Sequence, residues 1–303
     1  MARRLEWIVT QECAGVRVDT LLRKQLGLSG TVIRRMKWLE DGILVDGIRV
    51  NTRFVPAPGQ ALSVRLSDPE RRSGVVGADG DVDIVYEDED MVVVNKPAGL
   101  SVHPGPGHWD DTLGNFLVGY YQRTEQEADF HPVHRLDRGT SGLLVCAKHP
   151  HAQEKLKEQL HTRAFRRVYL AVCEGAPQPP VGVVDAPLGS KEGSLVEQCV
   201  RPDGKNACTR YETLAVSAGH TLLRLELDTG RTHQIRVHMA YLGHPLVGDF
   251  LYGTQQPEWK GRTALHSHRL QLCHPITGAA MEFVSPLPDD MAGLFQREVF
   301  DAY

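Results

Sequence analysis

Apolar residues along the chain follow two periods, and together these predict a body built from both strands and helices. From about residue 83 onward, short apolar or alternating runs predict β-strands, and apolar residues at a spacing of three or four predict amphipathic helices between them. The predicted strands are Ile84–Tyr86, Met91–Asn95, Gly142–Lys148, Arg167–Cys173, Ala207–Val216, Thr221–Leu227, Leu265–Leu272 and Met281–Val284. The predicted helices are Thr112–Tyr121, His149–His161, Thr232–Leu242 and Asp290–Val299.

The order of these elements predicts an α+β fold. The strands are long, are joined by turns such as Asp203-Gly204 and Thr277-Gly278, and alternate with helices without a repeating βα rhythm. We therefore expect a mixed, largely antiparallel central sheet with flanking helices. The sequence contains neither a P-loop nor a Gly-x-Gly-x-x-Gly motif after a predicted strand, so no nucleotide cofactor is expected.

The first 67 residues predict a small α/β domain, which we call the N-terminal module. A short helix is expected around Asp19–Leu26, and Ser29 is suited to cap a second helix that ends at Gly42. Apolar residues occupy one face of the second helix. The outward face is basic and comprises Arg34, Arg35 and Lys37.

The rest of the module is predicted to consist of β-strands joined by turns. Asp46-Gly47 between two apolar runs predicts a two-residue hairpin over Ile43–Val50, and a strand is expected at Ala61–Leu66. Residues 68–82 are rich in glycine and charge and lack hydrophobic periodicity, which predicts a linker. The larger domain then extends over residues 83–303.

Charge is distributed unevenly between these parts. Residues 1–66 contain eleven lysines and arginines against six acidic residues, whereas the remainder contains 23 against 32, and the whole chain of 303 residues has a formal net charge of −4. A small basic module on an acidic body favours a polyanionic partner, although a solvated helix face would produce the same charges.

Several protein classes do not fit the composition. No run of eighteen apolar residues predicts a membrane span, and the start of the chain lacks the apolar core of a signal peptide. The six cysteines are scattered and form no Cys-x-x-Cys pair, which favours reduced thiols over a disulfide framework or a zinc ribbon. We therefore expect a cytoplasmic protein.

The segment His134–Val145 is the strongest candidate for chemistry. It places the carboxylate of Asp137 between Arg135 and Arg138, on a turn rich in small residues just before an apolar strand. Two nearby cations favour the ionised carboxylate, and an ionised aspartate on a tight loop can act as a nucleophile or orient one. Taken alone, the same pattern also fits an aspartate that caps a turn or forms a surface ion pair.

Three other segments carry polar groups. Asn95–Gly105, which includes His103, is a polar, turn-rich loop after a buried strand. Tyr169 lies within an apolar strand, where a core tyrosine with a satisfied hydroxyl is the simplest interpretation. Gly230–His238 opens a helix, and a surface salt bridge is the simplest role for its Arg236. 

Two histidines could suggest a metal site. His131 and His134 are three residues apart, but they lie in a proline-containing loop rather than on a helix, and no third ligand is predictable. No metal is therefore expected.

Together, these segments closely resemble the pseudouridine synthases of the RluA/RluD class, which isomerise uridine in ribosomal or transfer RNA. The resemblance runs from about residue 83 to 287, and its most specific part is His134–Val145. Residues 15–66 resemble the small RNA-binding module of ribosomal protein S-four type, also called the alpha-L motif. Departures from the class are expected only in loop lengths between residues 174 and 206, where RNA selection could differ.

The resemblance implies a role for each matching residue. Asp137 would be the essential nucleophile, and Arg236 the basic residue paired with it. Tyr169 would pack against the uracil and assist proton removal, and Arg135 would help to displace the target nucleotide. RNA contacts are further expected from Arg138, His103, Arg34, Arg35 and Lys37.

The implied activity is therefore isomerisation of uridine in structured RNA, after the base has left its stack. Large-subunit ribosomal RNA is favoured and transfer RNA is an alternative, with no cofactor, no membrane association and a monomeric protein. Whether Asp137 attacks C6, attacks C1′ or promotes elimination through a glycal stays open. Two other classes are weighed against a synthase: a non-catalytic RNA-binding or ribosome-assembly factor, and a carboxylate glycosidase, for which the motifs offer no second acid.

Overall fold

The N-terminal module forms a four-stranded sheet with two helices packed against it in the computed structural model, which describes residues 2–67, 70–160, 162–254, 256–259 and 261–295. The sheet has the order β1-β4-β2-β3, and its apolar core is formed with both helices. The elements are β1 (Arg4–Ile8), α1 (Val18–Lys24), α2 (Gly30–Met36), β2 (Ile43–Val45), β3 (Ile48–Arg49) and β4 (Ala61–Arg65), with a 3₁₀ turn at Gln11–Cys13.

The predicted capping and turn residues of the module are confirmed in part. The Ser29 side chain accepts a hydrogen bond from the Val32 N–H and so caps α2. Asp46 and Gly47 both have positive φ (51° and 77°), as a two-residue hairpin turn requires. The predicted end of α2 at Gly42 is wrong, because the helix ends at Met36 and the chain turns back until Gly42 lies against the Met36 carbonyl. A Cβ at residue 42 would collide with that oxygen.

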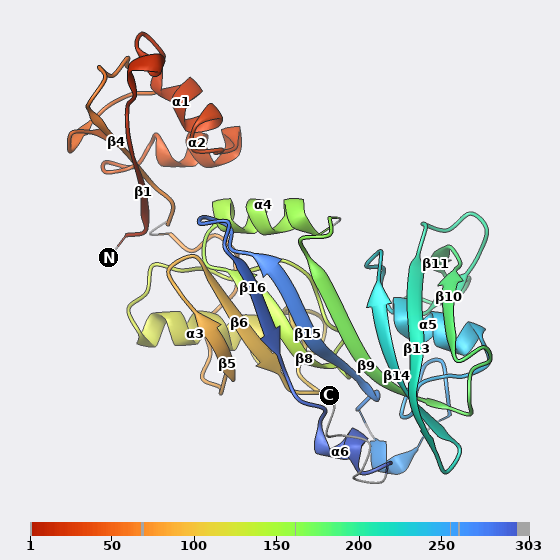
Figure 1. The fold of residues 1–303 in the computed structure, drawn as a ribbon. Coiled ribbons are helices and arrows are strands. Elements are labelled where there is room, and N and C mark those ends of the chain that lie inside the picture. The colour runs from red at the N-terminus through yellow and green to blue at the C-terminus, as the bar shows by residue number, and fades with distance from the viewer. Residues whose placement is uncertain (1, 68–69, 161, 255, 260, 296–303) are drawn as a thin grey trace.

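The larger domain is built on one ten-stranded sheet, which confirms the predicted mixed, largely antiparallel architecture (Figure 1). Its main path runs β10-β13-β14-β9-β15-β8-β6-β5, with β16 paired to β15 and β7 paired to β8. The strands are β5 (Ile84–Glu87), β6 (Met91–Lys96), β7 (His131–Pro132), β8 (Ser141–Ala147), β9 (Arg166–Glu174), β10 (Val181–Asp185), β13 (Cys208–Ser217), β14 (His220–Leu227), β15 (Leu265–Cys273) and β16 (Ala280–Val284). A separate pair is formed by β11 (Leu188–Ser190) and β12 (Gln198–Val200).

Helices cover both faces of this sheet. Along β6, Val92 and Val94 belong to the core with α3 (Leu113–Arg123) and α5 (Gln234–Tyr241), whereas Met91 and Val93 pack with α4 (Pro150–Gln159). This alternation is the period of two expected for a strand buried on both sides. The expected helix Asp290–Val299 is confirmed at its start, where α6 spans Asp289–Ala292, and is wrong at residues 293–295; residues 296–299 lie outside the described residues. A 3₁₀ turn occupies Pro257–Trp259.

A single parallel pairing in the large sheet joins β8 to β15. His266 and Ser267 pair with Ser141 and Gly142, whereas every other strand pair is antiparallel. Both strands therefore begin at the same edge, and the segment that precedes β8 lies beside the one that precedes β15. Gly142 has φ of +107°, and a Cβ at this position would collide with the Ser267 carbonyl oxygen.

The predicted linker contains neither a helix nor a strand where the structure describes it, yet it is bound to the larger domain. Arg71 donates to the carbonyls of Ala128 (2.9 Å) and Gln126 (2.8 Å). The Asn115 amide of α3 donates to the Val76 carbonyl (2.8 Å), and Ala78 N–H donates back to the Asn115 carbonyl (3.0 Å). The segment therefore follows the surface of α3.

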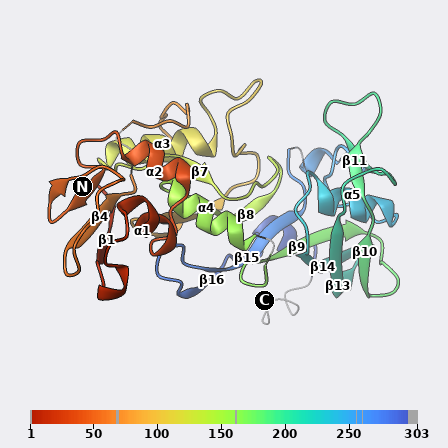
Figure 2. The ribbon, with the colours of Figure 1, turned by 90° about the horizontal axis from the view of Figure 1, so that it is seen from above.

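Side chains of the module also bond directly to the larger domain. Arg3 makes a two-pronged ion pair with Asp90 (2.8 and 3.0 Å), whose side chain is only 5% exposed. The Ser29 hydroxyl of the α2 cap donates to Glu154 of α4 (2.8 Å). Viewed from above, α2 lies beside α4 (Figure 2).

Within the described ranges, no helix is both long enough and apolar enough to cross a membrane.

The parallel junction between β8 and β15 generates a stability prediction. Gly142→Ala should lower the free energy of unfolding by about 3 kcal/mol, because the methyl group clashes with backbone in a left-handed conformation. Urea denaturation measures this change. The matched control is Gly193→Ala, where φ is +75° but no atom lies within 4 Å of the added methyl, so about 1 kcal/mol of backbone strain is expected. Equal losses for the two variants would contradict the proposed clash.

Candidate active site

The turn that carries Asp137 lies between β7 and β8, and its backbone is fixed on three sides. The carbonyl groups of residues 137, 138 and 139 each accept a hydrogen bond from a backbone N–H. In order, the donors are Thr140 (3.0 Å), Gly99 (2.8 Å) and Thr263 (3.1 Å). The turn is thus tied to itself, to the loop after β6 and to the segment before β15, so Asp137 has a defined position.

Lys96 also helps to hold the turn that carries Asp137 in place. Its side chain is buried at the end of β6, and the Nζ atom donates to the carbonyls of Pro97 (2.8 Å), Leu100 (2.8 Å) and Arg138 (3.3 Å). Burial lowers the pKa of Lys96 to about 7, and the nearby negative charge of Asp137 opposes that shift. Lys96 therefore fastens the loop after β6 to the Asp137 turn.

Arg236 is the cation that contacts Asp137. It lies in α5 and is buried, and its Nη1 atom is 3.2 Å from Asp137 Oδ2. Its remaining donors form a two-pronged pair with the fully buried Asp249, from Nε to Oδ2 and from Nη2 to Oδ1, both at 2.7 Å. Burial by itself would lower the pKa of Arg236, but the hydrogen bonds and charge of Asp249 raise it above the ordinary value. Arg236 is therefore a permanent charge whose Nη1 group remains available to Asp137.

His233, the residue before α5, faces Asp137 from the same side. Its Nε2 atom is 4.0 Å from Asp137 Oδ1, and its backbone is left-handed (φ 55°), which is uncommon for a non-glycine residue. The Tyr252 hydroxyl accepts from the Gln198 N–H (2.8 Å), so its own hydrogen is available for His233 Nδ1 (2.8 Å). Nδ1 can accept this hydrogen, and in that tautomer the neutral imidazole carries its own hydrogen on Nε2, toward Asp137.

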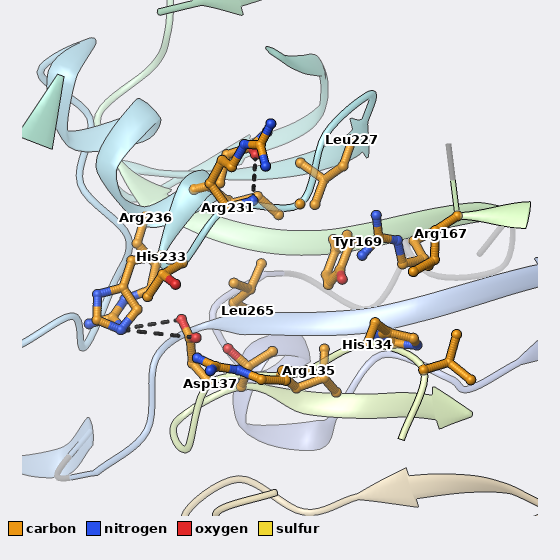
Figure 3. A pocket seen from close by; sticks show the side chains of 18 residues that line it. His134, Arg135, Asp137, Arg167, Tyr169, Leu227, Arg231, His233, Arg236 and Leu265 are labelled. Atoms are coloured by element: carbon orange, nitrogen blue, oxygen red, sulfur yellow. Dashed lines mark hydrogen bonds and ion pairs between the residues drawn. The ribbon is translucent and has the colours of Figure 1, made fainter. Parts of the chain in front are cut away.

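Tyr169 lies across a cavity from this group (Figure 3). The cavity measures about 420 Å³, and its apolar wall includes Leu136, Leu227, Ile235 and Leu265. Tyr169 is buried in β9, and burial raises the pKa of its hydroxyl, so the neutral phenol is present at neutral pH. The cavity thus combines a flat apolar surface with one carboxylate and its cations.

A second cavity of about 1130 Å³ opens on the other side of Asp137. It shares Asp137, His233 and Arg236 with the first cavity, and its further walls include His103, Phe250 and Trp259. The Asp137 group therefore stands between two spaces, each of which can hold part of a ligand.

The structure brings together some of the predicted site residues and separates others. Asp137, Arg236 and Arg135 line both cavities. Tyr169 lines only the first of the two, whereas His103 and Arg138 line only the second. The N-terminal module carries the rest: Arg34 is exposed, Lys37 lies over the Trp38 ring (4.8 Å from its centroid), and Arg35 lines a groove between the module and the larger domain.

Two sequence-based interpretations need correction. The surface salt bridge expected for Arg236 is wrong, because the α5 face that carries Arg236 is buried against Asp249. The two arginines that flank Asp137 in sequence do not pair with it. Arg138 donates to the Gly99 carbonyl (2.9 Å), and Arg135 is exposed and makes no hydrogen bond or ion pair with any described residue.

Four residues that contribute to the site were missed by sequence reasoning. Asp249 lies 13 residues beyond Arg236, in a loop whose sequence gives no sign that it returns to the helix. His233 and its partner Tyr252 were missed for the same reason, because only the fold joins them. A lysine at the end of an apolar strand was the one available signal for Lys96, since a buried ammonium group needs nearby acceptors.

The buried pair between Arg236 and Asp249 generates a prediction. Asp249→Asn should lower the free energy of unfolding by about 3 kcal/mol, because it leaves the buried Arg236 charge without its main partner. Urea denaturation measures the change. Asp290→Asn is the control, since Asp290 pairs with Arg262 at the same 2.7 Å but is 46% exposed, and a loss below about 1 kcal/mol is expected there. Similar losses for both variants would contradict the importance assigned to burial.

Solved structures share this fold. Human RNA Pseudouridylate Synthase Domain Containing 1 aligns with a TM-score of 0.57 at 28% identity, covering 73% of this chain and 92% of that protein. Human RNA Pseudouridylate Synthase Domain Containing 4 aligns with a TM-score of 0.56 at 28% identity, covering 69% and 90%.

Sequence relatives cover nearly the whole chain. The Yersinia pestis protein named Ribosomal large subunit pseudouridine synthase D is 39% identical over 305 residues, spanning 96% of this chain and 93% of the relative. The Bacillus subtilis protein named Uncharacterized RNA pseudouridine synthase YjbO is 38% identical over 274 residues, spanning 90% and 96%. A family model described as RNA pseudouridylate synthase matches residues 90–241. The family predicted from His134–Val145 is thus confirmed: the chain belongs to the RNA pseudouridine synthases.

Proposed function

We propose that this protein isomerises uridine to pseudouridine in large-subunit ribosomal RNA and that Asp137 is its nucleophile. The observation that carries the proposal is the position of the Asp137 carboxylate, held by Arg236 on one side of a cavity whose opposite wall is Tyr169. Within a family of RNA pseudouridine synthases, this is the place where a carboxylate can reach the junction of base and ribose.

The reaction needs few chemical groups. The bond from uracil N1 to ribose C1′ breaks, the base turns, and C5 bonds to C1′, while C5 loses a proton and N1 gains one. Attack at C6, attack at C1′ and elimination through a glycal all begin with an ionised carboxylate beside this bond. Arg236, itself anchored by Asp249, holds the Asp137 carboxylate in a fixed orientation through its Nη1 contact.

The freed base must stay in place while it turns. The apolar walls around Tyr169 provide a surface on which the ring can rotate without being lost to solvent. The neutral His233 offers its Nε2–H from the side of Asp137, where a uracil carbonyl or a ribose hydroxyl can accept it. These groups bind and orient the base, and Asp137 carries out the covalent step.

The target uridine reaches the cavity only after it leaves its stack, at a cost of a few kcal/mol. Arg135 is exposed at the rim of the cavity, so its side chain can occupy the space that the base vacates. Arg138 and His103, on the second cavity, are placed to contact adjacent nucleotides.

Two observations support ribosomal RNA as the substrate. The relatives named Ribosomal large subunit pseudouridine synthase D match along 85–96% of this chain, including the N-terminal residues. The N-terminal module contains two helices followed by a hairpin, which supports our interpretation of it as an S-four-type module with Arg34, Arg35 and Lys37 as its proposed RNA contacts. Transfer RNA is the alternative substrate.

We further propose a cytoplasmic monomer, since all six cysteines are free and one chain supplies every residue of the site.

A non-catalytic RNA-binding factor is the competing function. It would need the basic module but no carboxylate locked inside a cavity by a buried arginine. The same reasoning disfavours a two-carboxylate glycosidase, because Asp137 is the single acid among the described residues on the wall of the smaller cavity.

The nucleophile assignment predicts that Asp137→Asn lowers kcat at least about 1,000-fold. The assay is tritium release from ribosomal RNA labelled at uridine C5 and isolated from a strain that lacks this protein. Thermal denaturation should show that the variant is folded. Release by the variant at the wild-type rate would contradict the role of Asp137, and absence of release by the wild-type protein on ribosomal and transfer RNA would contradict the synthase.

The module assignment predicts that Arg34→Gln combined with Lys37→Gln weakens RNA affinity roughly tenfold and lowers the slope of log K against log salt by about 0.7–0.9 for each lost phosphate contact. Filter binding at several salt concentrations measures both quantities. Arg269→Gln is the control, because that arginine lies on β15, its side chain is 43% exposed, and it pairs with Glu282 (3.2 Å). An unchanged slope in the double variant would contradict the proposed contact between the N-terminal module and RNA.

A further inference from the structure

A groove of about 500 Å³ runs between the N-terminal module and the larger domain, and we call it the interdomain groove. Arg35 of α2 lies on one wall, Gln153 and Lys157 of α4 form another, and residues 130–135 form the floor. The cap contact between Ser29 and Glu154 holds α2 against α4 at this place (Figure 2). Both domains are therefore needed to form the groove.

The groove is positively charged in a protein whose net charge is negative. Its thirteen described lining residues include Arg35, Arg72, Arg135 and Lys157 but no aspartate or glutamate. Lys157 is exposed, and its side chain makes no hydrogen bond or ion pair with the described residues. Such a surface is complementary to an anion and unfavourable for another cation.

The acidic residues beside the groove are occupied elsewhere. The Asp129 carboxylate accepts from the backbone N–H groups of Arg72 (2.9 Å) and Ser73 (2.7 Å). Glu154 is bonded to Ser29, and Glu158 pairs with Lys155 (3.2 Å) on another side of α4. Arg72 has an exposed partner in Glu70 (3.3 Å), which does not line the groove. The positive charge of the floor and the α4 wall is therefore available to a ligand.

Two histidines of the groove have lowered pKa values, and the positive charges around them contribute to this. Burial lowers the pKa of His131 to about 4, and the positive charges of Arg35 and Lys157 contribute to that shift. Burial also lowers the pKa of His103, again with contributions from Arg135 and Lys157. These imidazoles are therefore neutral at neutral pH, and the arginines and the lysine supply the charge.

The groove leads to the catalytic cavity. His134 and Arg135 line both the groove and the cavity that holds Asp137 and Tyr169, and His103 lines both the groove and the second cavity. A ligand in the groove would thus be continuous with a nucleotide in the cavity.

We infer that the interdomain groove binds the phosphate backbone of a single RNA strand directly adjacent to the target uridine. This inference rests on the proposed function, which places a flipped uridine in the cavity beside Asp137. A nucleotide next to a flipped base has lost its regular stack, so its backbone is free to follow the groove that adjoins the cavity. Phosphates between Arg35 and Lys157 would join the module and the catalytic site into one RNA-binding surface.

The test compares Lys157→Ala with Lys155→Ala, which removes the same charge from the same helix outside the groove. Lys157→Ala should raise KM for ribosomal RNA about three- to tenfold and lower the slope of log K against log salt by about 0.7, because one phosphate contact is lost. It should leave kcat at saturating RNA unchanged, because Lys157 touches no reacting atom. Lys155→Ala should change none of these quantities. If the two variants behave alike while the wild-type enzyme is active, the inference that the groove binds RNA is overturned. If the wild-type protein is inactive, the proposed function is overturned instead.

A second experiment tests which RNA segment beside the target uridine occupies the groove. Stem-loop substrates are shortened by one nucleotide at a time on each side of the target uridine, and KM is measured for wild type and Lys157→Ala. The difference between the two proteins should vanish when the nucleotides in the groove are removed from one side. A difference that persists in every shortened RNA overturns the assignment to the adjacent strand.

Discussion

The buried ion pair between Arg236 and Asp249 is the interaction on which the site depends. A guanidinium group presents its donors in a fixed plane, so the two bonds to Asp249 leave Nη1 pointing at Asp137. The Tyr252 ring lies 5.1 Å from the guanidinium carbon and limits movement on that side. Because the same tyrosine orients His233, one small cluster sets both groups that face the carboxylate.

The sheet supplies the other half of this arrangement. Parallel pairing of β8 with β15 places the Asp137 turn next to the segment before β15, where the Gly139 carbonyl finds its donor. β9, the antiparallel neighbour of β15, carries Tyr169 to the facing wall, and β14 beyond it carries Leu227. The cavity between Asp137 and Tyr169 therefore lies over the middle of the sheet, on the face where α3 and α5 share the core.

Sequence patterns predicted much of this structure, and their failures have physical causes. Long apolar strands such as β8 and β15 were found because local periodicity determines them, and Asp137 stood out because several unusual residues are adjacent. The short strands β10, β11 and β12 were missed, since each gains its stability from a partner that lies elsewhere in the chain. Arg236 was expected beside Asp137 only from the family resemblance, because the helix pattern alone suggested a surface residue and cannot reveal Asp249 beneath it. The end of α2 was misplaced because Gly42 serves a close backbone approach rather than a helix cap.

The contact between Arg3 and Asp90 has a consequence for how the protein responds to ionic strength. The Asp90 side chain is 5% exposed and also bonds to His149 Nε2 (2.9 Å), so solvent ions reach it poorly. Contacts to RNA phosphates lie at the surface and weaken as salt increases. Rising salt would therefore release the nucleic acid while the two domains stay joined, and the enzyme would leave its product with its binding surface intact for the next substrate.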